Sequence, residues 1–437
     1  MPSVRVGWVK NMAPADVEAL DAIRFQRFIS HNQYPRDCST TEGEMTRAGV
    51  QEDGQTHWPG DYFYGLGLGS QMVSLKLNLA HALLHGRVYH FPSSHYVNPV
   101  RCARQTFDCY FAPPTNCSRL VKPSAPVERR FHHLKIKDAP LLWCFELPRQ
   151  RLSRLAGLRA VHSEAWYHGQ LAAFLFRPNS EMQAFRAEAL RSLDFDANHA
   201  RAATMDAAPG GLHNGSCAAM HVRRSDKFKG RRREDRRAPK NFTDFGFAYK
   251  YWAHFLSPRP ATQLRVLIGS EDPATFRAMP PLVRPSASYW LPGRYFVMDS
   301  FKDITDNNNK LVDRYARLKQ AMADAQASGG AAVAALEARG VRKDEGMALV
   351  LQILLMSECS ALFGSYASNV AILVHDLMHA RMVAKRDRMH AVDINGRTYC
   401  GCGASFCMKL ERRATREPQR KMLNMVEAFR GNNRNAI

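Results

Sequence analysis

The sequence contains no run of about 18 consecutive apolar residues, the length that a transmembrane helix needs. Its first residues, MPSVRVGWVKNMAP, lack the apolar core of a secretory signal peptide. Acidic residues are scarce: 40 Asp and Glu stand against 61 Lys and Arg, which gives a formal net charge of +21. The excess of basic residues favours an acidic partner, such as nucleic acid, an anionic membrane face or a phosphate-bearing small molecule.

Motifs for metal or nucleic-acid binding are also missing. RNA-binding, zinc-finger and helix-turn-helix signatures are absent, so net charge alone supports a nucleic-acid partner, and we expect none. The cysteines at 400, 402 and 407 lack paired CxxC spacing, which favours disulfides or free thiols over zinc. Asp194 and Asp196 form a DxD, but it follows a helix rather than an apolar strand, as a chance match would. We therefore expect no metal site.

Cysteines and glycosylation motifs favour a secretory compartment, although neither feature is specific to one. The chain has ten cysteines, and sequons occur at Asn116, Asn214 and Asn241. Free thiols and chance sequons are common in cytosolic enzymes as well. We expect a lumenal enzyme of the Golgi or secretory pathway, held at a membrane only through an anchor absent from this chain.

Apolar periodicity divides the 437 residues into two halves and a tail. The first half, 1–210, is expected to be an α/β acceptor-side domain. Its helices are expected at 15–29, at 70–85 after a glycine loop, and on both sides of Arg177-Pro178. Ser180 is expected to cap the helix after that proline, and residues 87–91 to form a short strand.

The second half, 211–410, alternates apolar runs with helical stretches, which predicts a parallel sheet with crossover helices. Strands are expected at 217–222, 264–270, 294–300 and 360–365. Residues 319–346 are rich in alanine and glycine, which predicts a helical insertion without chemistry. Residues 411–437 form a basic tail. The fold class is therefore α/β, with a Rossmann-like nucleotide-binding domain after the hinge DAAPGGLHNGS.

Polar residues follow three of these strands, at the sheet edge where ligands bind in open α/β folds. The first strand ends in HVRRSDK (221–227), the second in SED (270–272), and the last in GSYASN (364–369) before an apolar helix. Small residues and free N–H groups at a helix start suit a phosphate, and Arg223 would grip its oxygens bidentately. The alternative is that Ser365 and Ser368 cap the helix while the arginines pair with Asp226.

Several stretches resemble the core α1,6-fucosyltransferase family, which includes the bacterial nodulation fucosyltransferases. The similar segments are HVRRSDK, VLIGSEDPATF, LLMSECSALFGSYASNVAILVHDLM, AWYHGQLAAFLFRPN, GLGLGSQ and DCYFAPPTNC, in register over roughly residues 60–400. The resemblance implies a GT-B-like fold of two domains. It also implies metal-independent, inverting transfer of fucose from GDP-fucose to a sugar hydroxyl, with no cofactor beyond that donor.

The resemblance assigns roles to individual residues. His221 would contact the guanine and Arg223 the β-phosphate, while Ser368 and Asn369 close around the diphosphate from the other side. The remaining donor-site and catalytic candidates are Arg224, Asp226, Lys227, Asp272, Gly67 and Gly69. An inverting displacement needs a carboxylate to take the acceptor proton and fixed donors to hold the leaving diphosphate.

The chain departs from the family in three places. The loop FKGRRREDRRAPK is longer and more basic, so Glu234 is the best candidate for the base and Asp235 the fallback; both would otherwise only offset neighbouring arginines. Gln352 stands where the family has an aspartate that reads guanine, and an amide cannot accept two N–H bonds as a carboxylate does. Only about 27 residues follow Leu410, too few for an SH3-like domain such as the animal enzymes carry.

The predicted function is fucose transfer from GDP-fucose to a GlcNAc-containing glycan or glycoprotein, such as an N-glycan. A protein O-fucosyltransferase-like enzyme and a non-catalytic binder of glycan or nucleotide are the alternatives. A nucleic-acid binder would show a steep salt dependence and ignore GDP.

Overall fold

A computed structural model describes most of the expected helices and strands. It describes residues 12–34, 68–84, 149–192, 217–223, 242–257, 265–270, 287–290 and 344–394, with shorter stretches between 88 and 116, 275 and 283, 320 and 334, and 397 and 403. The helices are α1 (Pro14–Gln33), α3 (Leu68–Leu84), α5 (Arg149–Leu155), α6 (Glu164–Leu175), α7 (Ser180–Ser192), α10 (Phe242–Phe255), α15 (Glu345–Met356) and α16 (Asn369–Lys385). The strands are β1 (Cys217–Val222), β2 (Arg265–Ser270), β3 (Ala287–Trp290), β4 (Ala361–Gly364) and β5 (His390–Asp393).

The strands form a parallel sheet in the order β3-β2-β1-β4-β5. All six residues of β1 are buried, as expected for a central strand covered on both faces. The strands expected at 217–222, 264–270 and 360–365 are confirmed, whereas 294–300 lies outside the described residues. Because every neighbouring pair is parallel, the carboxyl ends of the strands share one edge of the sheet.

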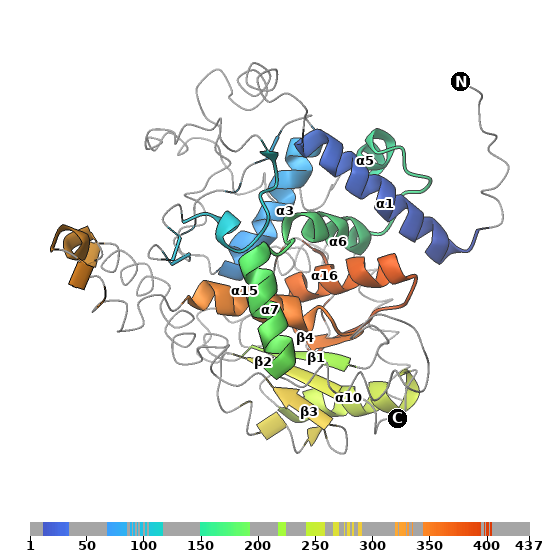
Figure 1. The fold of residues 1–437 in the computed structure, drawn as a ribbon. Coiled ribbons are helices and arrows are strands. Elements are labelled where there is room, and N and C mark those ends of the chain that lie inside the picture. The colour runs from blue at the N-terminus through green and yellow to red at the C-terminus, as the bar shows by residue number, and fades with distance from the viewer. Residues whose placement is uncertain are drawn as a thin grey trace, which may run out of the picture.

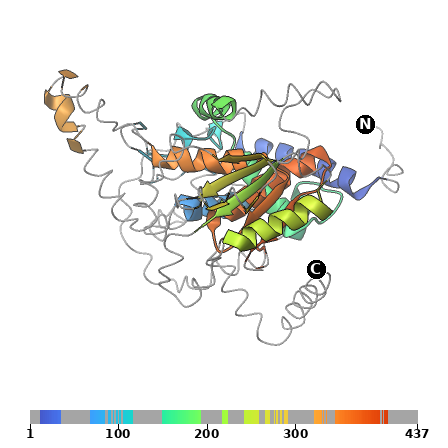
Figure 2. The same ribbon diagram turned by 90° about the horizontal axis from the view of Figure 1, so that it is seen from below.

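Helices cover both faces of the sheet (Figures 1 and 2). On one face α10 packs with Trp252 against β-strand residues such as Met220 and Phe363. On the other face lie α15 and α16, and α1, α3, α6 and α7 pack over them as a further layer.

One hydrophobic core joins the two halves of the chain. Phe25 of α1 and Trp166 of α6 belong to the same buried cluster as Val350 of α15 and Ile372 of α16. This cluster crosses the boundary expected at 210–211. The described part of the chain is therefore a layered α/β structure, and its division into two GT-B-like domains stays a prediction.

Helices α6 and α16 approach closely at a glycine. A Cβ atom on Gly169 would lie 2.9 Å from the Asp376 carbonyl oxygen and 3.2 Å from the Ala380 amide nitrogen. Only a residue without a side chain allows the two backbones to come so near. Through this contact, α6 from the first half of the chain packs directly against α16, the helix that follows β4.

Two local expectations are wrong. Asn179, not Ser180, caps α7: its Oδ1 accepts from the Met182 amide at 2.9 Å. Within 87–91, the described residues Val88, Tyr89 and Phe91 are not in a strand. Tyr89 and Phe91 are buried among other aromatic rings, so the apolar run reflects core packing rather than sheet pairing.

All described cysteines are in disulfides. Cys102 pairs with Cys109, and Cys217 at the start of β1 pairs with Cys359 just before β4. Cys400 is also disulfide-bonded. The Cys102–Cys109 bond ends in the short 3-10 helix Phe107–Cys109, while the Cys217–Cys359 bond joins the starts of two neighbouring strands, opposite their polar ends.

Among the described helices, none has the combination of length and apolar character that crossing a bilayer would require.

Candidate functional site

The ends of β1 and β4 meet at the start of α16. His221 Nε2 lies 3.0 Å from the Ser368 hydroxyl oxygen, and both side chains are buried. Arg223 follows β1 directly and is partly buried. The structure therefore brings together the first and last of the three polar strand ends, which are separated by more than a hundred residues of sequence.

The serine loop is held by its own backbone and by β5. The Ser368 amide donates to the Ser365 carbonyl at 2.8 Å, and the Tyr366 amide donates to the Asp393 carboxylate at 2.7 Å. Ser365 Oγ accepts from the Ala367 amide at 3.2 Å. These bonds fix the loop, so that it enters α16 in one conformation.

Ser368 occupies the N-cap position of α16 but does not cap the helix with its hydroxyl. The hydroxyl faces His221 instead. The alternative in which Ser368 serves only as a cap therefore lacks its defining hydrogen bond. The first N–H groups of α16 and its positive dipole end are oriented towards the strand edge, where an anion would be stabilised.

The imidazole of His221 is neutral at physiological pH. Burial lowers the pKa of His221 to about 3, and the neighbouring Arg223 guanidinium adds to this effect. A neutral ring positions Ser368 without adding charge to the site. A contact of this ring with a nucleotide base stays a prediction, because the structure shows its Nε2 turned towards Ser368.

A second helix begins beside α16. The Asn369 side-chain amide donates to the Ser70 hydroxyl of α3, and a Cβ atom on Gly69 would lie 3.4 Å from the Val370 nitrogen. Gly69, in the first turn of α3, is thus in contact with the first turn of α16. Two positive helix ends therefore meet at the same edge of the sheet.

Two turns further along both helices, a buried ion pair joins them. Lys76 of α3 donates to the Asp376 carboxylate of α16 and to the Gly401 carbonyl at 3.2 Å, and the Tyr399 hydroxyl also donates to Asp376. Burial alone would raise the pKa of Asp376, but Lys76, His375 and His168 together lower it to about 2. Burial lowers the pKa of Lys76 against the attraction of Asp376.

Sequence analysis missed this pair. The only local signal is a charged residue inside each of two apolar helical runs, LKLNLAHALL and NVAILVHDLM. Such residues are almost never fully buried unless they are paired. The pair keeps α3 and α16 parallel, and so keeps their two starts together.

Gln352 lies at the same edge, on α15. A Cβ atom on Gly269 would lie 1.9 Å from Gln352 Nε2, so the amide occupies the space above that glycine. Gly269 pairs with His221 across the sheet. Within the described part of the chain, Gln352 Nε2 is buried and has no hydrogen-bond partner. A role of this amide in reading a base stays a prediction.

The other candidate residues are outside the described part of the chain. They are Gly67, Arg224, Asp226, Lys227, Glu234, Asp235 and Asp272, together with the DxD residues Asp194 and Asp196. In the described residues, no group of His, Cys, Asp or Glu is arranged to hold a metal ion.

Comparison with known proteins gave matches only among solved structures. No protein-family model and no curated protein matches the chain. Two similar structures are of NodZ α1,6-fucosyltransferase, one co-crystallised with GDP and one soaked with GDP-fucose. The first has 13% identity and a TM-score of 0.35 over 70% of this chain and 88% of that chain. The second has 15% identity and a TM-score of 0.34 over 70% and 89%. Scores this low do not establish a common fold, so the function is argued from this chain's own residues.

Proposed function

We propose that the protein is a glycosyltransferase that moves fucose from GDP-fucose to a hydroxyl of a GlcNAc-containing glycan. The observation that carries this proposal is the meeting of the β1 end, with His221 and Arg223, and the start of α16 at Ser368. The motif resemblance described above supports the choice of fucose and of guanine.

The diphosphate would lie between Arg223 and the starts of α16 and α3. Arg223 would fork onto two oxygens, and the helix N–H groups would take others. These donors are in place before the reaction, so they would stabilise the charge that develops as the diphosphate leaves. In other sugar transferases a metal ion stabilises the leaving diphosphate. Here Arg223 and the helix dipoles would take that role.

The acceptor hydroxyl needs a base on the opposite side of the sugar. Glu234 is the first candidate and Asp235 the second, with Arg224, Asp226 and Lys227 organising the site around them. Cationic neighbours lower the pKa of a carboxylate, which keeps it ionised but weakens it as a base. Inversion at the sugar carbon would follow from a single displacement by the activated hydroxyl.

Compartment and acceptor are part of the proposal. Disulfides persist in oxidising compartments, and every described cysteine forms one. This supports a Golgi or secretory-pathway lumen, where N-glycans are modified. A glycan or glycoprotein acceptor fits that setting.

A thermal-shift screen of the full chain against GDP, UDP and ADP sugars, with and without EDTA, tests the proposal. GDP-fucose at about a hundred times its dissociation constant should stabilise the protein by about 2.7 kcal/mol, with or without EDTA. Preference for UDP sugars together with dependence on a metal would contradict the proposal.

A further inference from the structure

An exposed arginine face lies on the side of the molecule away from the candidate site. It comprises the outer surface of α1, helix α5 and the loop 156–163, and six arginines on it are exposed: Arg24, Arg27, Arg149, Arg151, Arg154 and Arg159. We call this the arginine face. The acidic residues of these segments, Asp16, Glu18 and Asp21, are partly or fully buried. The exposed charge of these segments is therefore predominantly positive, with Asp16 partly exposed beside Arg386.

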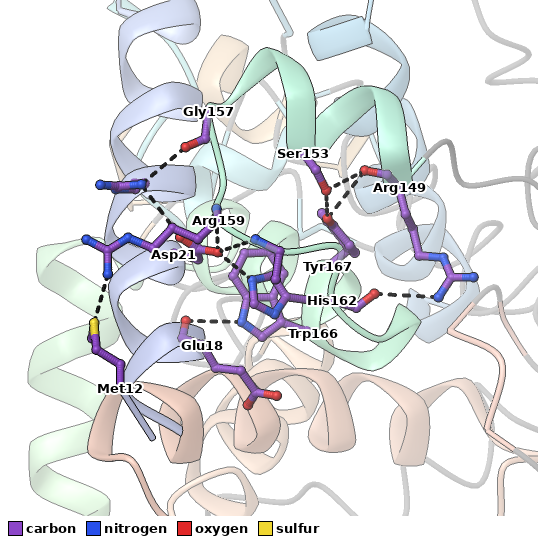
Figure 3. Close-up of polar contacts among 12 residues, drawn as sticks. Met12, Glu18, Asp21, Arg149, Ser153, Gly157, Arg159, His162, Trp166 and Tyr167 are labelled. Atoms are coloured by element: carbon purple, nitrogen blue, oxygen red, sulfur yellow. Dashed lines mark hydrogen bonds and ion pairs between the residues drawn. The ribbon is translucent and has the colours of Figure 1, made fainter. Parts of the chain in front are cut away.

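A buried carboxylate fixes the backbone that displays these arginines. Asp21 Oδ2 accepts from the amides of Arg159 and Ala160 at 2.9 and 3.1 Å and lies 2.8 Å from His162 Nε2 (Figure 3). Arg24 Nη1 donates to the Gly157 carbonyl at 3.3 Å. The loop is thus tied to α1 by several bonds, and the arginine face is preorganised rather than a loose run of charge.

Helix α5 is fixed in a similar way. Ser153 Oγ and the Tyr167 hydroxyl donate to the Arg149 carbonyl at 2.7 and 3.3 Å, while Arg149 Nη1 reaches the His162 carbonyl at 3.5 Å (Figure 3). Leu152 is fully buried beneath the helix. The backbone of the short helix is therefore held in place, and its arginines face outward.

Aliphatic side chains are interleaved with the arginines. Ile23, Leu155 and Val161 are 51%, 48% and 54% exposed, and they are half of the exposed large hydrophobic residues in the described part of the chain. Basic residues mixed with exposed aliphatic side chains are typical of proteins that bind the interface of an anionic bilayer.

An apolar groove borders this face. A cavity of about 740 Å³ between α1, α6 and α16 has Ile23 and Arg27 on its lining, together with small apolar residues such as Ala173, Ala380 and Ala384. An apolar recess beside cations matches the acyl and phosphate parts of a phospholipid. Polysaccharides and nucleic acids have no acyl chain for such a recess, and single-stranded nucleic acids favour exposed aromatic rings instead.

The face and the candidate site lie at opposite ends of α3. Arg151 Nη2 donates at 3.2 Å to the carbonyl of Leu84, the last residue of α3, whereas Gly69 and Ser70 at its start contact α16 at the site. A helix of 17 residues spans about 25 Å. A partner on the arginine face would leave the strand edge open.

We propose that the arginine face docks the protein on the surface of an anionic phospholipid bilayer. The arginines bind lipid phosphates and carboxylates, while Ile23, Leu155 and Val161 enter the headgroup region. This attachment depends neither on the proposed transferase activity nor on the proposed lumenal compartment.

Vesicle co-sedimentation of the full chain tests the proposal. The protein should bind phosphatidylcholine vesicles that contain phosphatidylserine, should bind pure phosphatidylcholine vesicles far less, and should be released by salt. Each arginine near a charged bilayer contributes about fivefold to the partition coefficient, so Arg27→Gln with Arg154→Gln should lower it about 25-fold. Within the described residues, neither side chain makes a hydrogen bond or ion pair that the change would remove.

Two further variants distinguish docking through the arginine face from non-specific adsorption to vesicles. Leu155→Gln with Val161→Gln should weaken vesicle binding about fivefold or more. The matched control, Lys250→Gln on α10 with Leu256→Gln directly after that helix, changes one exposed basic and one exposed apolar residue away from the arginine face and should leave binding unchanged. Nucleotide thermal shifts should be the same in all three variants, so failure of this proposal is distinguishable from failure of the proposed function.

Equal binding to neutral and anionic vesicles, or none to either, would overturn the proposal. So would binding to heparin or DNA that the arginine variants abolish when no vesicle is bound, because the face would then serve a soluble polyanion.

Discussion

The two ends of α3 carry positive charge for different physical reasons. At its start, Gly69 and Ser70 lie against Asn369, and positive potential comes from backbone N–H groups in a largely buried setting. At its end, Leu84 accepts from Arg151, and the charge comes from exposed guanidinium groups. Fixed dipoles favour one ligand geometry, whereas exposed charges act over a surface and are screened by salt.

The largest effect is expected from Asp376, which joins α3 to α16 between these two ends. Asp376→Asn leaves the Lys76 ammonium buried without its counter-charge, so the free energy of unfolding should fall by about 3–5 kcal/mol. Urea denaturation measures the loss. The double variant Lys76→Met with Asp376→Leu should recover most of it, and a loss below about 1 kcal/mol for the single variant would show that the pair does not hold the helices together.

Lowering the pH should reduce the free energy of unfolding through His221, at the candidate-site end of α3. The folded-state pKa of His221 is about 3 and its unfolded value about 6.5, so its contribution is present above pH 6.5 and is lost as pH falls. By pH 5 this loss is about 2 kcal/mol. His379, with a pKa of about 4, adds to the same trend. His221→Gln should flatten the dependence between pH 7 and 5; an unchanged slope would contradict the burial of a neutral ring.

A smaller effect is expected at Ser368. Ser368→Ala removes the partner of the buried His221 Nε2, which should cost about 1–2 kcal/mol of stability and weaken nucleotide binding. Ser328→Ala is the matched control, because Ser328 is exposed and bonds only the Asp324 carbonyl within its own helix. Equal stabilities for the two variants in urea denaturation would argue against a structural role for the His221–Ser368 contact.

The smallest effect is expected at the far end of α3. Arg151→Gln removes one donor to the Leu84 carbonyl and one cation near the helix end, a loss of about 0.3–1 kcal/mol. Thermal unfolding measures it, and nucleotide binding serves as the control readout. Altered GDP affinity in this variant would show that the two ends of α3 are not independent.

Local apolar patterns were enough to predict most of the elements around the site. β1, β2, β4 and the helices α3 and α16 each have a continuous or periodic apolar run, and the structure confirms them. β5 was missed because an edge strand with few buried residues has no such pattern. β3 was missed because its four residues follow a proline-rich stretch typical of a loop.

Long-range pairings were beyond local patterns. Lys76 and Asp376 are 300 residues apart, and Cys217 and Cys359 are 142 apart. A lone charge in an apolar helical run indicates that Lys76 and Asp376 are each paired, but no local pattern identifies the partner in either pair. For His221 and Ser368, the sequence predicted only that the two strand ends lie near each other. Parallel strands end at one edge of the sheet, but this does not specify which side chains meet.

Titration of GDP into the full chain, compared with Arg223→Lys, tests the central claim most directly. Lysine keeps the positive charge but cannot fork onto two phosphate oxygens, so GDP affinity should fall about tenfold or more, while guanosine binding changes little. Equal GDP affinity in the two proteins, or no GDP binding by either, would contradict a diphosphate site between β1 and the start of α16.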